Sequence, residues 1–197
     1  MAEVISRRMV VAGLVGITAF PSVLLARPTP RAAQLIAAAR RQIGVTLSYD
    51  PAYSRLDFPG GDVARAKGVC TDVVIRAYRD AFALDLQALV NADMRRTFGA
   101  YPRRWGLRTT DRNIDHRRVP NLQTFLKRSG ASLPVGDWQP GDIFTSIING
   151  SLPHIGIVSD QRAARGHPLV IHNIGGGARE EDALFGHRLT GRFRWQV

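Results

Sequence analysis

The stretch that decides the fold is Gly68-Val69-Cys70-Thr71-Asp72-Val73-Val74-Ile75-Arg76-Ala77-Tyr78-Arg79-Asp80. It contains the only cysteine of the chain, which follows a glycine by two positions. The apolar residues from there on recur three or four positions apart, as on one face of a helix: Cys70, Val73, Val74, Ala77, Tyr78, Ala81 and Phe82. The pattern predicts a helix that begins at Cys70 and turns this side chain toward the core.

A cysteine at the start of a helix has two interpretations. Unpaired backbone N–H groups and the helix dipole favour the thiolate, which is the nucleophilic form of sulfur. Free cysteine is also among the most frequently buried residue types, and a packed core residue would show the same spacing. Asp72 in the first turn favours the helix but would raise the pKa of the thiol. Cys70 is therefore a candidate nucleophile, with core packing as the alternative.

The first 26 residues have the build of an export signal. Two arginines precede an apolar run over residues 9–26, which ends in Leu25-Ala26. Ser6-Arg7-Arg8 resembles the start of a twin-arginine signal, although Sec export is left open. A proline breaks the run and no stop-transfer flank follows, so we expect cleavage after Ala26 and no membrane span afterwards. We predict a periplasmic or otherwise extracytoplasmic protein in which residues 27–197 form a single domain.

The chain is strongly basic, with 27 Lys and Arg, 16 Asp and Glu, and a net charge of +11. Such a charge attracts nucleic acid, anionic lipid or an anionic wall polymer. Export argues against nucleic acid, and the arginines are scattered without the interleaved aromatic residues of a strand-binding groove. The scattering favours a solvated basic surface over a dedicated anion-binding site, with attraction to an anionic lipid or wall polymer as the alternative. The oligomeric state stays open.

Helical signals fill the N-terminal half of the chain and strand signals fill the C-terminal half. Besides the cysteine helix, helices are expected from Thr29-Pro30 to Gly44, after Asp85, and over 122–126 with a stop at Gly130. Strands are expected over 143–148, 154–158, 169–173 and 189–197, with an Asn149-Gly150 hairpin between the first two. This order predicts an α+β domain whose N-terminal helices pack on a C-terminal antiparallel sheet.

Two irregular segments offer further candidate residues. Tyr49 and Tyr53 precede the cysteine helix, where either could donate a hydrogen bond to an oxyanion or simply cover the core. The segment from Thr97 to Arg118 is dense in Gly, Pro and Arg and is a candidate substrate-contacting loop. Asp115 and His116 are adjacent in it, a spacing that favours a surface ion pair with the neighbouring arginines over a catalytic or metal pair.

A helix-borne thiol needs a base and a third group that orients the base. His154 begins one expected strand and His172 lies near the end of the next. In an antiparallel pair the two can stand side by side, one facing the thiol and the other orienting it, although a single strand histidine is usually structural. The sequence has no His-Glu-x-x-His motif and no paired cysteines, so we expect neither a metal nor a cofactor.

The order of these motifs resembles the NlpC-type branch of the papain-like cysteine peptidases. The matching residues are Cys70, Trp138-Gln139-Pro140-Gly141-Asp142, His154-Ile155-Gly156-Ile157-Val158 and Val170-Ile171-His172. More closely, the chain from about residue 34 onward resembles the family catalogued as domain of unknown function 1287. That likeness rests on Gly68-Val69-Cys70-Thr71-Asp72, Asn113-Ile114-Asp115-His116-Arg117-Arg118 and His172-Asn173-Ile174-Gly175.

The broader resemblance implies a papain-like fold and hydrolysis of amide bonds in peptidoglycan stem peptides. It also implies peptidoglycan or another anionic wall peptide as the partner. Residue by residue, it implies Cys70 as nucleophile, His154 as general base and His172 as the orienting group. The usual Asp-Cys-Ser is here Val69-Cys70-Thr71, and the segment 159–168 leaves the pairing of the histidines open, so Asn173 is an alternative orienting group. A catalytically inactive domain that binds wall peptides and a papain-like acyltransferase are the alternative functions.

Overall fold

The computed structural model describes residues 27–197; the predicted export signal over residues 1–26 lies outside them. The helices are α1 (Pro30–Arg40), α2 (Cys70–Phe82), α3 (Leu86–Arg96) and α4 (Val119–Arg128), with short 3-10 turns η1 (Phe98–Ala100) and η2 (Asp115–Arg117). The strands are β1 (Ser48–Tyr49), β2 (Lys67–Gly68), β3 (Ser132–Leu133), β4 (Ile143–Ile148), β5 (Leu152–Arg162), β6 (Pro168–Asn173), β7 (Ala178–Glu181) and β8 (Arg188–Phe193). Within the described range, no helix is long and apolar enough to cross a membrane.

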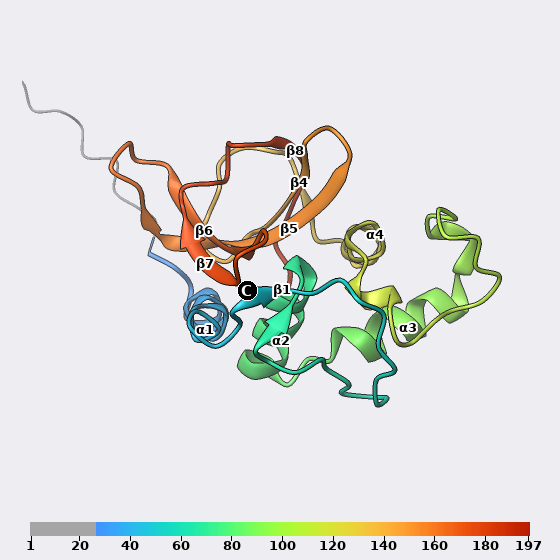
Figure 1. The fold of residues 1–197 in the computed structure, drawn as a ribbon. Coiled ribbons are helices and arrows are strands. Elements are labelled where there is room, and N and C mark those ends of the chain that lie inside the picture. The colour runs from blue at the N-terminus through green and yellow to red at the C-terminus, as the bar shows by residue number, and fades with distance from the viewer. Residues whose placement is uncertain (1–26) are drawn as a thin grey trace, which may run out of the picture.

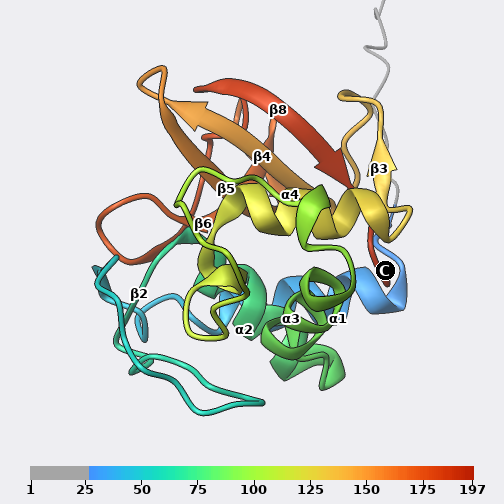
Figure 2. The same ribbon diagram turned by 90° about the vertical axis from the view of Figure 1, so that its right-hand side faces the viewer.

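Six of the strands form one antiparallel sheet in the order β3-β8-β4-β5-β6-β7. The helices α1, α2 and α4 lie on one side of this sheet, and α3 lies farther from it, beyond α2 and α4 (Figures 1 and 2). The two-residue strands β1 and β2 pair in parallel beside the start of α2. The predicted α+β order of helices first and antiparallel sheet second is confirmed.

Local sequence explains where the helices begin. The Thr29 side chain accepts a hydrogen bond from the Ala32 N–H and Pro30 occupies the first position of α1. The Asp85 side chain caps α3 in the same way, through the Gln87 N–H at 3.1 Å. These caps satisfy N–H groups that have no partner inside the helix, so the predicted starts of both helices are confirmed.

The sheet separates two apolar clusters because side chains alternate between the faces of a strand. The larger cluster lies between the sheet and the helices and includes Cys70, Tyr78, Ile155 and Ile157. The smaller one covers the opposite face and consists of Phe144, Val158, Val170 and Leu184, packed beneath Trp138, Ala183 and Leu189. Both faces of the sheet are therefore covered.

The predicted hairpin is confirmed, since Asn149 and Gly150 adopt φ values of 47° and 76° between β4 and β5. The loop between β5 and β6 is shorter than the segment 159–168 that the sequence left between two expected strands. Strand β5 continues to Arg162, which pairs with Pro168 at the start of β6. Strand β7 was not expected from the sequence. It adds the row of side chains next to β6, which matters for the site below.

The prediction that the last strand reaches residue 197 is wrong, because β8 ends at Phe193. Arg192 of this strand is buried, with its Nε 2.7 Å from Asp142 Oδ2. The Arg194 Nε bonds the other oxygen of the same carboxylate at 2.8 Å. Trp195 still packs inward, with its ring centre 5.0 Å from that of Tyr78. The buried Asp142 carboxylate thus binds one arginine inside β8 and one just after the strand ends.

Candidate active site

Cys70 is the first residue of α2 and is only 3% exposed. It lines a cleft of about 430 Å³ together with Tyr49, Pro153 and residues of the segment between α3 and α4. No hydrogen bond among the described residues uses the Cys70 backbone N–H, as expected for the first turn of a helix. The cleft is therefore lined by a residue that offers both a sulfur atom and a backbone N–H group without a partner in residues 27–197.

Gly68 makes room for the polar groups around this helix start. A Cβ atom at Gly68 would lie 3.0 Å from Asp72 Oδ2 and 3.1 Å from a guanidinium nitrogen of Arg76. Asp72 Oδ2 accepts a hydrogen bond from the Val69 N–H at 2.7 Å. The carboxylate also forms two bonds to the buried Arg117 guanidinium, at 3.0 and 2.9 Å. Asp72 thus holds the turn before Cys70 and is paired with a positive charge.

The thiol of Cys70 is protonated at neutral pH. Burial raises the pKa of Cys70 to about 11, and the negative charge of Asp72 adds to the increase. The backbone N–H groups of Ile155 and Thr71 and the Tyr49 hydroxyl act in the opposite direction. The expectation that Asp72 raises the pKa of the thiol is confirmed in direction, but burial is the larger cause.

A chain of hydrogen bonds links three side chains on neighbouring strands. His154 Nε2 of β5 lies 2.8 Å from His172 Nδ1 of β6, and His172 Nε2 lies 2.8 Å from Glu181 Oε1 of β7. Both histidines are buried, whereas the Glu181 side chain is 40% exposed. The two histidines therefore stand side by side, in the arrangement that antiparallel pairing predicted.

These hydrogen bonds determine which ring nitrogen of each histidine carries a proton. The carboxylate of Glu181 can only accept, so His172 Nε2 carries a hydrogen. Burial lowers the pKa of His172 and lowers that of His154 to about 3, with His172 as the second cause for His154, so both rings are neutral at pH 7. A neutral His172 must then accept at Nδ1 from His154 Nε2, which leaves the basic lone pair on His154 Nδ1. Glu181 thus sets the tautomer of both rings.

Gly156 is required for this contact. A Cβ atom there would lie 2.9 Å from the Cβ of His172 and 2.6 Å from the ring of Phe144. The Phe144 ring centre lies 5.9 Å from that of His154 and 6.3 Å from that of His172. The glycine of the His-x-Gly-Ile motif therefore lets the ring of Phe144 and the second histidine pack directly against β5.

Cys70 and the histidines reach the same end of the sheet from opposite faces. Phe144, which packs against both imidazoles, belongs to the smaller cluster, whereas Cys70 packs with Ile155 on the helix side. No hydrogen bond between the thiol and His154 occurs among the described residues. His154 lines a second hollow, of about 450 Å³, that shares Tyr49, Pro51 and Pro153 with the Cys70 cleft. The two groups thus border adjoining hollows.

Tyr49 lies between the two hollows, so the sequence-based candidate for oxyanion donor is placed next to the thiol. Burial raises the pKa of its hydroxyl, with the neighbouring Cys70 as the second cause, and the hydroxyl therefore keeps its proton. Tyr53 is engaged elsewhere, because its hydroxyl lies 3.1 Å from Asp111 Oδ2 and 2.9 Å from Asn113 Nδ2. The prediction that Tyr53 serves the site is wrong.

Asn173 does not orient His154, because its Nδ2 donates to the Gly68 carbonyl at 3.0 Å and the position beside His154 belongs to His172. This bond ties the end of β6 to the residue that precedes the Val69-Cys70 turn. Asn173 is therefore a structural connection between the sheet and the start of α2, and its alternative role as orienting group is wrong.

Asp115 and His116 are buried, at 1% and 2% exposure, so the expectation of a surface pair in a substrate loop is wrong for these two residues. Asp115 forms the expected ion pair with Arg118, at 3.2 Å, and accepts from the Asp111 N–H at 2.6 Å. Burial raises the pKa of Asp115 and lowers that of His116 to about 4. Arg104, Trp105 and Arg118 of the same segment do line the Cys70 cleft.

Glu181 is the site residue that the sequence reasoning missed. It lies on β7, where three consecutive charged residues follow Ala178 and give no apolar strand signal, and only the pairing of β6 with β7 brings it to His172. In the part of the chain that the structure describes, no group of three His, Cys, Asp or Glu side chains is arranged to hold a metal ion.

In the Asp72→Asn variant, iodoacetamide is expected to alkylate Cys70 faster than in the unaltered chain. Removing the carboxylate charge, while keeping an acceptor for the Val69 N–H, lowers the pKa of the thiol and raises the thiolate fraction about tenfold per pKa unit. The measurement is the rate of iodoacetamide reaction between pH 6 and 10. For the unaltered chain the rate should rise throughout this range, and a plateau below pH 8 would show an ion-paired thiolate and contradict the assignment.

The Glu181→Ala variant is expected to lose roughly 10- to 100-fold of any activity that uses His154 as a base, because the tautomers of both imidazoles are no longer set. Nitrogen NMR of the imidazoles is the direct measurement, and it should report protonation moving from Nε2 toward Nδ1 of His154. Asp182→Ala removes a neighbouring exposed carboxylate and is the matched control. Equal spectra for the two variants would refute the role of Glu181.

Comparison with known proteins places the chain in a family. The model described as "Domain of unknown function (DUF1287)" matches residues 36–195. A curated relative, "Uncharacterized protein YijF" of Escherichia coli (strain K12), is 53% identical over 163 residues, which cover 81% of this chain and 79% of the relative. Neither description names a reaction, and the resemblance to NlpC-type peptidases stays a prediction. The matched span contains Cys70, both buried strand histidines and Glu181, and on this evidence the chain belongs to the DUF1287 family.

Proposed function

We propose that this chain is an exported cysteine hydrolase with a papain-like, NlpC-type fold that cleaves amide bonds in peptidoglycan stem peptides. The observation that carries the proposal is the hydrogen-bonded chain from Glu181 through His172 to His154, which leaves a basic nitrogen on His154 at the end of the sheet where α2 presents Cys70. Nucleophilic acyl transfer requires a thiol and an oriented imidazole that can take its proton, and here these two groups border adjoining hollows.

The reaction would begin from a neutral thiol and a neutral imidazole. As the sulfur attacks the peptide carbonyl, the thiol proton passes to His154 Nδ1, and the developing oxyanion accepts hydrogen bonds from the Cys70 N–H and the Tyr49 hydroxyl. His154 then gives the proton to the leaving amine, and water hydrolyses the thioester. Because the thiol and His154 lie in adjoining hollows, the substrate carbonyl would have to bind beside Tyr49 and Pro153.

The test is incubation of purified sacculi with the mature chain, with Cys70→Ala, and without protein, followed by mass analysis of the soluble fragments. The hydrolase proposal expects stem-peptide fragments with new amine and carboxyl ends from the unaltered chain alone. Release by neither protein, when both are folded and bind sacculi, would contradict it.

A second candidate is a catalytically inactive domain that binds wall peptides through the same cleft. Two observations favour it: the thiol is 3% exposed with a pKa of about 11, and no hydrogen bond to His154 is present among the described residues. Alkylation separates the two candidates, because a binding domain needs no reaction at Cys70 before unfolding, whereas the hydrolase must admit a small electrophile to the folded site.

A further inference from the structure

The wall of the Cys70 cleft that faces away from His154 is built from arginine. Arg104, Arg117 and Arg118 line the cleft, and its lining includes no aspartate or glutamate. Aspartates just behind the lining pair with two of these arginines, so the charge available to a ligand depends on which guanidinium groups are already used.

Arg117 is fully used by the protein. Its guanidinium forms two bonds to Asp72 and further bonds to the carbonyl oxygens of Ala52 and Asp50, each at 3.2 Å. The side chains of Arg117 and Asp72 are 2% and 4% exposed. This pair is a buried structural element and contributes little net charge to the cleft.

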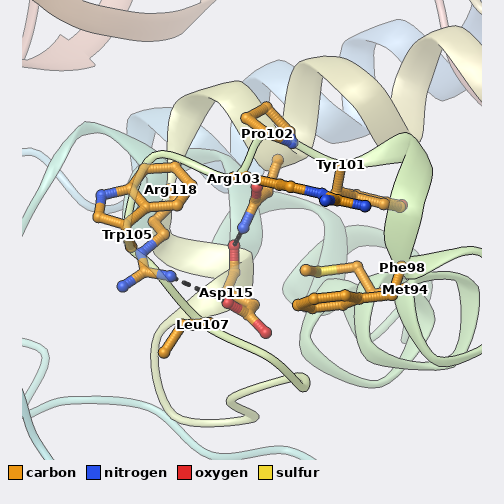
Figure 3. Close-up of a pocket in the computed structure, with 10 residues that line it drawn as sticks. Met94, Phe98, Tyr101, Pro102, Arg103, Trp105, Leu107, Asp115 and Arg118 are labelled. Carbon is orange, nitrogen blue, oxygen red and sulfur yellow. Dashed lines mark hydrogen bonds and ion pairs between the residues drawn. The ribbon is translucent and has the colours of Figure 1, made fainter.

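Unlike Arg117, Arg118 and Arg104 keep guanidinium nitrogens that no described residue uses. Arg118 uses one nitrogen for Asp115, at 3.2 Å, and its guanidinium carbon lies 4.0 Å from the centre of the Trp105 ring (Figure 3). Stacking on an indole fixes the plane of a guanidinium and leaves its edge available for a forked pair of hydrogen bonds. Over residues 27–197, neither the remaining nitrogens of Arg118 nor the exposed Arg104 side chain has a hydrogen-bond or ion-pair partner.

We propose that Arg104 and Arg118, the latter stacked on Trp105, form a subsite for a carboxylate group of the substrate. This inference rests on the proposed hydrolase function and adds to it the charge of the substrate and the direction in which it binds. A carboxylate matches the forked donors of a guanidinium, and within residues 27–197 the Arg104 side chain has no ion-pair partner while Arg118 uses only one nitrogen for Asp115.

The hollow that contains His154, on the other side of Tyr49, indicates in which direction the substrate binds. It is lined by Ile148, Leu152, Ile174 and His154 and contains no carboxylate or guanidinium. An uncharged part of the substrate therefore fits on the His154 side, and the anionic part fits on the Trp105 side. The subsite predicts substrates that carry a free carboxylate near, and on one side only of, the bond that is cut.

The test compares two alkylating reagents of nearly equal size, iodoacetate and iodoacetamide. In both reactions the Cys70 thiolate forms a bond to the methylene carbon and iodide leaves, so the ratio of the two rate constants cancels any change in the thiolate fraction. At pH 9 the iodoacetate to iodoacetamide ratio for the folded chain should exceed that of the urea-unfolded chain by about tenfold, because only the folded chain presents the arginines.

The Arg104→Gln, Arg118→Gln double variant should bring this ratio to that of the unfolded chain. Arg104→Gln alone, which leaves the Asp115 ion pair intact, should lower the ratio part of the way. Arg108→Gln removes an exposed arginine of the same segment that does not line the cleft and should leave the ratio unchanged. Reaction with both reagents but an equal ratio in all variants would overturn the subsite and leave the hydrolase standing. A thiol that reacts with neither reagent before unfolding would overturn both.

Discussion

The His154→Gln variant is expected to release stem peptides about 10²- to 10⁴-fold more slowly than the unaltered chain. The glutamine amide can still donate to His172 Nδ1 and so keeps the buried hydrogen bond, but it has no nitrogen that can take the thiol proton. Because Cys70 has a pKa of about 11, few molecules carry a thiolate at neutral pH, and attack depends on a base. The measurement is the rate of fragment release from sacculi at pH 7.

The pH dependence sharpens this prediction. In His154→Gln the remaining activity should rise with pH through the neutral range, since hydroxide must take the place of the missing base. His167→Gln is the matched control, because His167 is an exposed histidine that pairs with Asp182 and takes no part in the hydrogen-bonded chain. The double variant with Cys70→Ala should be no slower than Cys70→Ala alone, because the two residues act in one step. Additive losses would contradict a shared step.

The Arg76→Met variant is expected to lower the free energy of unfolding by about 3–5 kcal/mol. Arg76 has no exposed surface and binds the Asp62 carboxylate through Nε at 2.9 Å and through Nη2 at 3.0 Å. It also donates to Thr46 Oγ1 at 3.1 Å and to the carbonyl oxygens of Val63 and Lys67 at 3.1 and 3.0 Å. Methionine fills the space but leaves these acceptors buried without a donor.

The measurement is urea unfolding followed by circular dichroism, with Arg65→Met as the control. Arg65 makes an even shorter bidentate pair with Asp80, at 2.7 Å for both bonds, but its side chain is 46% exposed. Exposed ion pairs contribute about 0–1 kcal/mol, so the two variants should differ by several kcal/mol. Equal losses would show that burial of Arg76 is not what makes its network stabilising.

Short-range signals in the sequence predicted the elements well. The helical spacing from Cys70, the caps at Thr29 and Asp85 and the Asn149-Gly150 turn each depend on residues within one or two turns of chain, and all occur as expected. The strand and turn signals in the C-terminal half likewise identified four strands of the sheet, β4, β5, β6 and β8. The failure came at the chain end, where β8 stops at Phe193 and the Arg194 side chain binds Asp142, some 50 residues away in sequence.

For the candidate site, too, local sequence predicted some features and long-range contacts decided the others. The sequence by itself determined that one cysteine begins a helix and that two histidines lie on adjacent antiparallel strands, because periodicity and hairpin signals are local. Only the tertiary structure decided that Glu181 sets their tautomers, that Asp72 is paired with Arg117, and that burial keeps the thiol of Cys70 protonated. The physical reason is that ionisation and proton position depend on desolvation and on partners brought together by strand pairing and loop packing, and neither is encoded in the spacing of residues along the chain.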